Sequence, residues 1–355
     1  VMKTIYVGMS GGVDSSVAAA LLKEQGYDVT GVYMKNWSQD LPSMPCPWKE
    51  DFQDAKRVAV QLGIDFKMYD FETEYRQKVV DYMTAEYQAG RTPNPDVMCN
   101  QEVKFKLFLN TALEDGADMI ATGHYASVYQ HENGRYVITK GVDETKDQSY
   151  VLWGLQQDLL SRTLLPLGTY RKTEIRQMAH DMGYPELAKK SESYEICFVP
   201  DNDYRGFLKR RVEGLEEKVA GGFFIDKEGK ILGNHKGYPF YTIGQRKGLG
   251  IALGHPMFVT RIFPESNTVM LGTVDELDRT SATVRNLNLV KYASINEPLE
   301  AITKIRYKDA GALSTIVQEG DKMKVEFHHA VSGIAPGQSA VFYEGQDLLG
   351  GGFLI

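Results

Sequence analysis

Apolar residues in the first part of the chain alternate between short continuous runs and helical spacing. The runs at residues 4–9, 27–34, 64–71 and 118–122 predict β-strands. Between them, apolar positions recur three or four residues apart, and two of these stretches stop at Gly26 and Gly63, as helices commonly do. The expected helices cover residues 13–25, 55–62, 75–87 and 103–113. Such alternation is typical of an α/β fold with a doubly wound parallel sheet.

The pattern changes after Ala121. Asn133-Gly134 lies between two alternating segments and predicts a β-hairpin, and helical stretches follow at residues 148–160 and 172–182. From about Val199 onward helices become scarce and short strands separated by glycines dominate. We therefore expect two small, mainly β domains after the α/β domain, the last of them a β-barrel.

Length and composition agree with several domains. The composition, 43% hydrophobic and 25% charged, is that of an ordinary globular protein. The length of 355 residues exceeds the usual upper limit for a single hydrophobic core. We expect domains at residues 1–198, 199–279 and 280–355. No apolar run approaches the ~18 residues needed to cross a bilayer, and the N-terminal segment lacks the pattern of a signal peptide. A cytoplasmic protein without membrane contact is predicted.

The cysteines and the net charge narrow the chemistry. Cys46, Cys99 and Cys197 are too few and too scattered for a disulfide framework or a four-ligand zinc site, so we expect no resident metal and a catalytic, redox or packing role for each thiol. The net charge of −7 counts against a nucleic-acid partner held by phosphate neutralisation alone. Local basic clusters remain at residues 205–211, 246–247 and 304–308.

A glycine- and serine-rich loop connects the first strand to the first helix. Its two glycines permit close backbone approach to a phosphate, its serine hydroxyls can donate to phosphate oxygens, and the following helix supplies free N–H groups. The loop is neither a Walker loop nor a complete dinucleotide fingerprint, and an ordinary strand-to-helix turn is the alternative. The candidate nucleotide-binding residues are Gly8, Met9, Ser10, Gly11, Gly12, Val13, Asp14, Ser15 and Ser16.

Three further residues belong to this candidate nucleotide site. Asp14 is a candidate ligand for a Mg²⁺ that bridges the phosphates, although it can equally be only a helix cap. Met34 ends the second predicted strand and Gly123 follows the fourth. Ligands of open α/β sheets bind at this edge, so we expect both residues to contact the adenosine.

Cys99 lies in a proline-containing loop just before a predicted helix. A helix N-terminus can lower the pKa of a thiol, and Asp96, three residues earlier, is a candidate general base. In isolation, each residue is more simply interpreted as a small buried side chain and a turn-former. Cys197 lies in an apolar segment, residues 193–199, that predicts a strand, and by itself it is typical of a core cysteine.

Several long motifs occur together in one order. They are SGGVDSS (10–16), GRTPNPDVMCN (90–100), ATGHYA (121–126), KDQSY (146–150), ICF (196–198), YTIGQRKGLG (241–250) and APGQSAVFY (335–343). The first resembles the pyrophosphate-binding loop of the PP-loop ATPases. Together they resemble the tRNA-specific 2-thiouridylase family over nearly the whole chain.

This resemblance implies a reaction and its participants. ATP, with Mg²⁺, would be cleaved between the α- and β-phosphates, Cys197 would carry a persulfide received from a cysteine desulfurase or sulfur-relay protein, and Cys99 would be the nucleophile or resolving thiol. The partner would be a tRNA with a wobble uridine. Asn94, Pro95 and Asp96 would approach the target base, and Lys146, Asp147, Gln148, Arg306 and Tyr307 would contact the tRNA.

The chain departs from the family pattern at one place, because Tyr194 and Glu195 stand where the family usually has Thr-Gly before the second cysteine. Loss of that glycine narrows the backbone freedom beside Cys197. Two other functions stay open from the residues alone. One is another adenylylating PP-loop ligase or an amidotransferase-type synthetase, and the other is a tRNA-binding module without catalysis.

Overall fold

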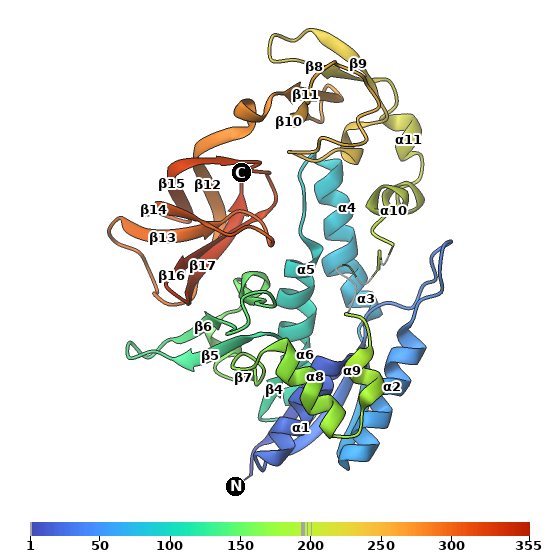
Figure 1. Ribbon diagram of the computed structural model, residues 1–355, viewed down its shortest axis with the longest axis vertical. Helices are drawn as coiled ribbons and strands as arrows, with labels where there is room; N and C mark the ends of the chain where they lie inside the picture. The colour runs from blue at the N-terminus through green and yellow to red at the C-terminus, as the bar shows by residue number, and fades with distance from the viewer. Residues whose placement is uncertain (1, 193–195, 197, 200) are drawn as a thin grey trace.

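The computed structural model, described for residues 2–192, 196, 198–199 and 201–355, begins with a parallel five-stranded sheet (Figure 1). The strand order is β3-β2-β1-β4-β7, and each pairing is parallel. The doubly wound sheet is therefore confirmed, with a fifth strand of only two residues that no apolar run announced. The strands are β1 (Thr4–Gly8), β2 (Asp28–Lys35), β3 (Asp65–Asp70), β4 (Met119–Ala121) and β7 (Thr163–Leu164).

Helices cover both faces of this sheet because side chains alternate along its strands. Ile5 and Val7 point to one face, which packs against α1 (Val13–Glu24), α2 (Trp48–Leu62), α8 (Lys172–Asp181) and α9 (Pro185–Lys189). Tyr6 points to the opposite face, which packs against a different set of helices.

Two long helical runs cover that second face. The first is α3 (Glu72–Tyr75), η1 (Arg76–Val80) and α4 (Asp81–Gln88), and the second is α5 (Pro95–Met98), η2 (Cys99–Leu107) and α6 (Phe108–Glu114). The second run begins eight residues before the predicted start at Val103. Asn94 explains the difference, because its side chain accepts hydrogen bonds from the Asp96 and Val97 amides at 3.1 and 3.4 Å, and Pro95 suits the first helical position. The predicted loop from Arg91 to Asn100 was therefore wrong from Pro95 onward.

The predicted hairpin at Asn133-Gly134 is confirmed as β5 (Ala126–Gln130) and β6 (Tyr136–Lys140). This hairpin is not part of the parallel sheet. It extends the C-terminal sheet, where Thr139 pairs with Asp347. The helix expected over residues 148–160 is interrupted, because only η3 (Ser149–Leu152) and α7 (Gln157–Leu160) are helical. A segment of the N-terminal half is thus built into the C-terminal sheet.

The middle of the chain forms a small sheet of order β10-β11-β8-β9. Two short helices precede it, and two 3₁₀ turns accompany it. The elements are α10 (Tyr204–Arg211), α11 (Leu215–Lys218), β8 (Gly222–Ile225), β9 (Ile231–His235), η4 (Tyr238–Phe240), β10 (Phe258–Phe263), β11 (Thr268–Gly272) and η5 (Val274–Leu277).

The C-terminal part is a closed antiparallel barrel with its own core, which confirms the predicted β-barrel. Its strands follow the order β12-β15-β14-β13-β16-β17, and pairing of β12 with β17 closes it. The strands are β12 (Asp278–Leu289), β13 (Leu299–Lys304), β14 (Ala312–Glu319), β15 (Lys322–Ser332), β16 (Ser339–Glu344) and β17 (Asp347–Leu354).

The described residues also bear on the strand predicted over residues 193–199 and on membrane-spanning helices. Ile196, Phe198 and Val199 do not lie in a strand, so the strand predicted over residues 193–199 is not found at these positions. Within the described chain, no helix combines the length and the apolar character that crossing a bilayer requires.

Candidate active site

The glycine- and serine-rich loop is held by its own hydroxyl groups. The Ser10 amide donates to Ser15 Oγ at 3.1 Å, and Ser16 Oγ donates to the Gly12 carbonyl at 2.8 Å. Gly12 is the N-cap of α1 and has no side chain to satisfy the first amides of that helix. The loop therefore presents backbone N–H groups at a helix N-terminus, which is the arrangement that binds phosphate.

Close packing explains two of the predicted glycines. Gly11 has φ +83°, and a Cβ there would lie 2.4 Å from the Asp51 carbonyl oxygen. A Cβ on Gly123 would lie 2.7 Å from the Ser15 nitrogen, so the end of β4 presses directly against the first turn of α1. Met34 lies beside the same loop, because its Cε would be 2.9 Å from a Cβ on Gly8. The predicted nucleotide residues therefore gather at one edge of the sheet.

Asp14 has hydrogen-bond partners that could not be predicted from the sequence. Lys172 Nζ donates to its two carboxylate oxygens at 2.6 and 2.7 Å, and Tyr125 Oη donates to Oδ1 at 2.6 Å. Burial, together with the charge of Asp14, raises the pKa of Tyr125 above its ordinary value, so this phenol stays a donor. Asp14 is thus held in place by Lys172 and Tyr125, and Lys172 contacts both of its carboxylate oxygens.

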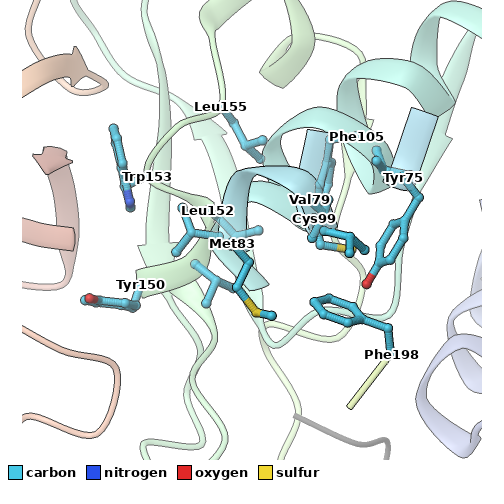
Figure 2. Packing of buried hydrophobic residues seen from close by; sticks show 14 of the residues in the cluster. Tyr75, Val79, Met83, Cys99, Phe105, Tyr150, Leu152, Trp153, Leu155 and Phe198 are labelled. Atoms are coloured by element: carbon cyan, nitrogen blue, oxygen red, sulfur yellow. The ribbon is translucent and has the colours of Figure 1, made fainter. Parts of the chain in front are cut away.

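Cys99 is buried, with 3% of its surface exposed, and it lies one turn inside the helical run that begins at Pro95. Figure 2 shows Cys99 beside Val79, Tyr75 and Phe198. The helix expected to follow Cys99 therefore contains it. The thiol still lies near the N-terminus of this helical run.

Cys197, Tyr194 and Glu195 lie outside the described residues. The neighbouring Phe198 is described, and its ring packs 5.9 Å from that of Tyr75, edge to face, and 5.0 Å from that of Phe207. Because Phe198 also lies beside Cys99 (Figure 2), the residue next to Cys197 reaches the cluster that contains the other cysteine.

Asp96 lies in the first turn of the helical run that holds Cys99. Asn100 Nδ2 donates to its backbone carbonyl at 2.9 Å and to its Oδ1 at 3.2 Å, and Lys104 Nζ lies 4.0 Å from Oδ1. Asn94 and Pro95 cap and open the same helix. The three residues predicted to approach the target base are therefore adjacent and fixed by local hydrogen bonds.

The barrel holds the backbone just before these residues. The Thr92 amide donates to the Pro336 carbonyl at 2.9 Å, and Gln338 Nε2 donates to the carbonyls of Thr92 and Pro93 at 2.9 and 3.1 Å. The APGQSAVFY motif thus begins at a contact with the GRTPNPDVMCN motif.

The residues predicted to contact tRNA come together from two distant segments. Tyr307 Oη donates to the Asp147 carbonyl at 3.4 Å, which joins the segment of Arg306 and Tyr307 to residues 146–148. Lys146 pairs with Glu192. The Asp147 carboxylate accepts from the Gly141 and Ser149 amides and the Ser149 hydroxyl, and Gln148 Oε1 accepts from the Tyr125 amide at 3.0 Å. Asp147 and Gln148 therefore also brace this loop.

Comparison with known proteins identifies the family. Family models match residues 3–201 (tRNA methyl transferase HUP domain), 205–273 (tRNA methyl transferase PRC-barrel domain) and 279–354 (aminomethyltransferase beta-barrel domain). The chain is 51% identical to the tRNA-specific 2-thiouridylase MnmA of Amoebophilus asiaticus, over 99% of this chain and 94% of the relative. It is 52% identical to the protein of that name from Cytophaga hutchinsonii and 48% to that from Salinibacter ruber, over 99% of this chain and 96% and 94% of those relatives. The chain belongs to the tRNA-specific 2-thiouridylase family.

In this 2-thiouridylase family member, sequence reasoning missed several residues around the loop. Lys172 and Tyr125 hold Asp14, and Lys190 Nζ donates to the Gly11 carbonyl at 3.2 Å and to Asp51 and Asp54, both at 2.9 Å. Burial acts to lower the pKa of Lys190, but its hydrogen bonds to Asp51 and Asp54 outweigh this and raise it. Only Tyr125 carried a signal, as part of ATGHYA.

His124 is a further missed residue of the same motif. Its Nδ1 lies 2.8 Å from Thr122 Oγ1, and its ring lies 5.2 Å from that of Phe105. Burial, helped by the charge of Lys104, lowers the pKa of His124 to about 3, so the imidazole is neutral near pH 7. Because Gly123 touches the loop and Phe105 lies in the helical run of Cys99, Gly123 and His124 link the loop to the cysteine.

Proposed function

We propose that this protein uses ATP to replace the 2-oxygen of a tRNA wobble uridine with sulfur, acting in the cytoplasm. The observation that carries the proposal is that Gly123 and His124 link the glycine- and serine-rich loop to the helical run that holds Cys99. Gly123 packs against the glycine- and serine-rich loop, and the adjacent His124 packs against Phe105 of the helical run that holds Cys99. A nucleotide on the loop and a base beside Cys99 would therefore meet at the same place.

The first step activates the uridine. A uracil oxygen is a poor leaving group, and attack of that oxygen on the α-phosphate of ATP turns it into an oxygen of AMP and releases pyrophosphate. The free amides at the start of α1 would hold the departing phosphates, and Lys172 and Lys190 would place positive charge beside the loop. Mg²⁺ bound with ATP would neutralise phosphate charge, and Asp14 is the carboxylate placed to hold it once Lys172 turns to the phosphates.

The second step brings in the sulfur. The terminal sulfur of a Cys197 persulfide, supplied by a cysteine desulfurase or a sulfur-relay protein, attacks the activated carbon, and AMP leaves. The Cys99 thiolate then attacks the Cys197 sulfur, which releases the thiolated uridine and leaves a Cys99–Cys197 disulfide for a cellular thiol to reduce. If Cys99 cuts the persulfide first, the sulfide released attacks the same carbon. Asp96, three residues from Cys99, would accept the proton that the Cys99 thiol loses as it becomes this thiolate.

The wobble base must leave its stack to reach this site. Asn94, Pro95 and Asp96 lie where the base would arrive, and the patch of Lys146, Arg306 and Tyr307 would hold the tRNA beside it. Because Cys99 is buried beside Phe198, we expect the base to displace the Phe198 side chain when it enters.

Nucleoside analysis tests this function. tRNA lacking the modification is incubated with the protein, Mg-ATP and a persulfide donor, and its nucleosides are separated and weighed by mass spectrometry. We expect 2-thiouridine with the wild type and none with Cys197→Ser or Cys99→Ser, while a Cys46→Ser control retains activity. Conversion of ATP to AMP without a thiolated base, unchanged in both cysteine variants, would instead indicate a PP-loop ligase of another kind.

A further inference from the structure

Two lysines from different parts of the fold lie over neighbouring tyrosine rings. Lys140 ends β6, and its Nζ lies 4.4 Å from the centroid of the Tyr343 ring. Lys304 ends β13 in the barrel, and its Nζ lies 5.7 Å from the centroid of the Tyr150 ring. Both rings are buried, and Ser149 joins them because its hydroxyl lies 2.9 Å from Tyr343 Oη. In Figure 2, Tyr150 points away from the Cys99 cluster.

This pair of ammonium groups has no acidic counterpart of its own. Among the ion pairs of the described residues, neither Lys140 nor Lys304 has a carboxylate within 4.0 Å. The acid that attracts Lys304 most strongly, Asp147, already accepts three hydrogen bonds from Gly141 and Ser149. Burial and the charge of Lys140 lower the pKa of Lys304, despite the attraction of Asp147 and the weaker attraction of Asp309. Two half-buried like charges repel each other, so an anion placed between them is favoured.

The spacing of the two lysines is set by the fold. The Lys140 amide donates to the Gln346 carbonyl at 2.9 Å, and Thr139 pairs with Asp347, so β6 is fixed to the barrel. Lys304 pairs with Val341 on the next barrel strand. The strands that carry the two lysines are therefore both fixed to the barrel before any ligand arrives.

We propose that Lys140 and Lys304 together bind one backbone phosphate of the RNA substrate, an inference that rests on the proposed function. The surroundings favour an RNA phosphate over other anions. Tyr307, whose ring lies 5.8 Å from that of Tyr150, keeps 36% of its surface exposed and can stack on a base. Arg306 precedes it. Cations beside an exposed aromatic ring are the combination that holds single-stranded RNA.

Binding of unmodified tRNA to the full chain tests the pair. Lys140→Met, Lys304→Met and the double variant keep an apolar stem over each tyrosine ring but lose the charge. Lys322→Met is the matched control, because Lys322 lies far from Lys304. Lys322 pairs with Glu319 at one end of β14, and Thr303, the neighbour of Lys304, pairs with Ala312 at the other end. The two ends of β14 are seven residue steps apart, which corresponds to roughly 23 Å.

The measured quantities are the tRNA dissociation constant and its dependence on salt between roughly 50 and 200 mM. We expect about tenfold weaker binding in each single variant and a salt slope that is lower by about one in the double variant. Lys322→Met should match the wild type, and ATP binding should be unchanged in all four variants.

Two results would overturn the inference. One is a double variant with the affinity and salt slope of the wild type, and the other is weaker binding with an unchanged slope, which indicates a disturbed fold rather than a lost phosphate contact. Both leave the proposed function standing, because the wild type still binds and thiolates tRNA. A wild type that does not bind tRNA contradicts the proposed function itself.

Discussion

Lys172 and Asp14 form an ion pair in which the ammonium donates to both carboxylate oxygens, at 2.6 and 2.7 Å. The pair joins the start of α8 to the first turn of α1, although the two residues are far apart in the sequence. Lys172 is buried and Asp14 is partly exposed. The loop that would bind phosphate is therefore positioned by a lysine that sits at the edge of that site.

Lys172→Met tests this relationship. Removing one partner leaves Asp14 without its counter-charge, so the free energy of unfolding should fall by about 2 kcal/mol, less than for a fully buried pair because Asp14 meets solvent. ATP affinity, measured by titration calorimetry, should fall about tenfold because a cation beside the phosphates is lost. Lys189→Met, at an exposed lysine of α9, is the control.

A double-mutant cycle with Asp14→Asn gives the outcome that would contradict this account. The two changes should cost less together than the sum of their separate effects, because they remove the same interaction. Strictly additive losses of stability and of ATP affinity would mean that the pair does not couple α8 to the loop.

Gly123→Ala should damage the loop without touching its sequence. The added Cβ would lie 2.7 Å from the Ser15 nitrogen, which is backbone and cannot step aside, so we expect a loss of at least about 2 kcal/mol in unfolding free energy and loss of ATP binding. Gly12→Ala is the comparison, because its Cβ would meet only Ser10 Oγ at 3.5 Å. Its unfolding free energy should fall by less than about 1 kcal/mol, the usual cost of alanine at an N-cap. Equal stability losses in the two variants would argue against the close contact.

Phe198→Leu should make Cys99 more reactive. The smaller side chain uncovers the thiol that Phe198 shields, so alkylation of Cys99 by iodoacetamide, followed by peptide mass spectrometry, should be severalfold faster. Phe224→Leu changes a fully buried ring of the middle sheet and serves as the control. An unchanged labelling rate in the Phe198 variant would show that this ring does not limit access to Cys99.

His124 should make stability depend on pH. In the unfolded chain a histidine titrates near its ordinary pKa of about 6.5, whereas burial lowers the folded pKa to about 3. The unfolded state therefore binds the extra proton between these values, and stability falls as the pH falls from about 6.5 towards 3, by about 1.4 kcal/mol per pH unit for this residue.

Urea unfolding between pH 7 and 5 checks the prediction for His124. In His124→Gln the loss of stability on acidification should be smaller than in the wild type, because the variant has no imidazole to protonate in its unfolded state. His180→Gln, at an exposed histidine of α8, should keep the wild-type dependence. A His124 variant with the wild-type pH dependence would contradict the assignment.

Local sequence patterns predicted the helices and strands but did not predict the contacts between distant segments. The parallel sheet, the loop at its edge, the hairpin at Asn133-Gly134 and the barrel follow from periodicity and turn residues, which act over a few positions. The early start of the helix at Pro95 depends on one cap by Asn94. The pairings Lys172–Asp14 and Thr139–Asp347 join segments more than a hundred residues apart, and neither has a local signature.

The candidate site divides in the same way. The residues predicted around the loop gather at one sheet edge, and Cys99 lies in the helix that His124 connects to that edge. The lysines that contact the loop, Lys172 and Lys190, could not be predicted, because a lysine in or beside a helix is usually only a solvated residue. The roles of the site residues and the domain limits at residues 198 and 279 stay predictions.

The most direct measurement follows the oxygen that leaves the uridine. A tRNA carrying ¹⁸O at the 2-position of its wobble uridine is thiolated by the wild-type protein with Mg-ATP and a persulfide donor, and the AMP is analysed by mass spectrometry. If the uracil oxygen is activated as an ester of AMP, each AMP released with a thiolated uridine carries one ¹⁸O. Unlabelled AMP formed together with thiolated tRNA would contradict the account.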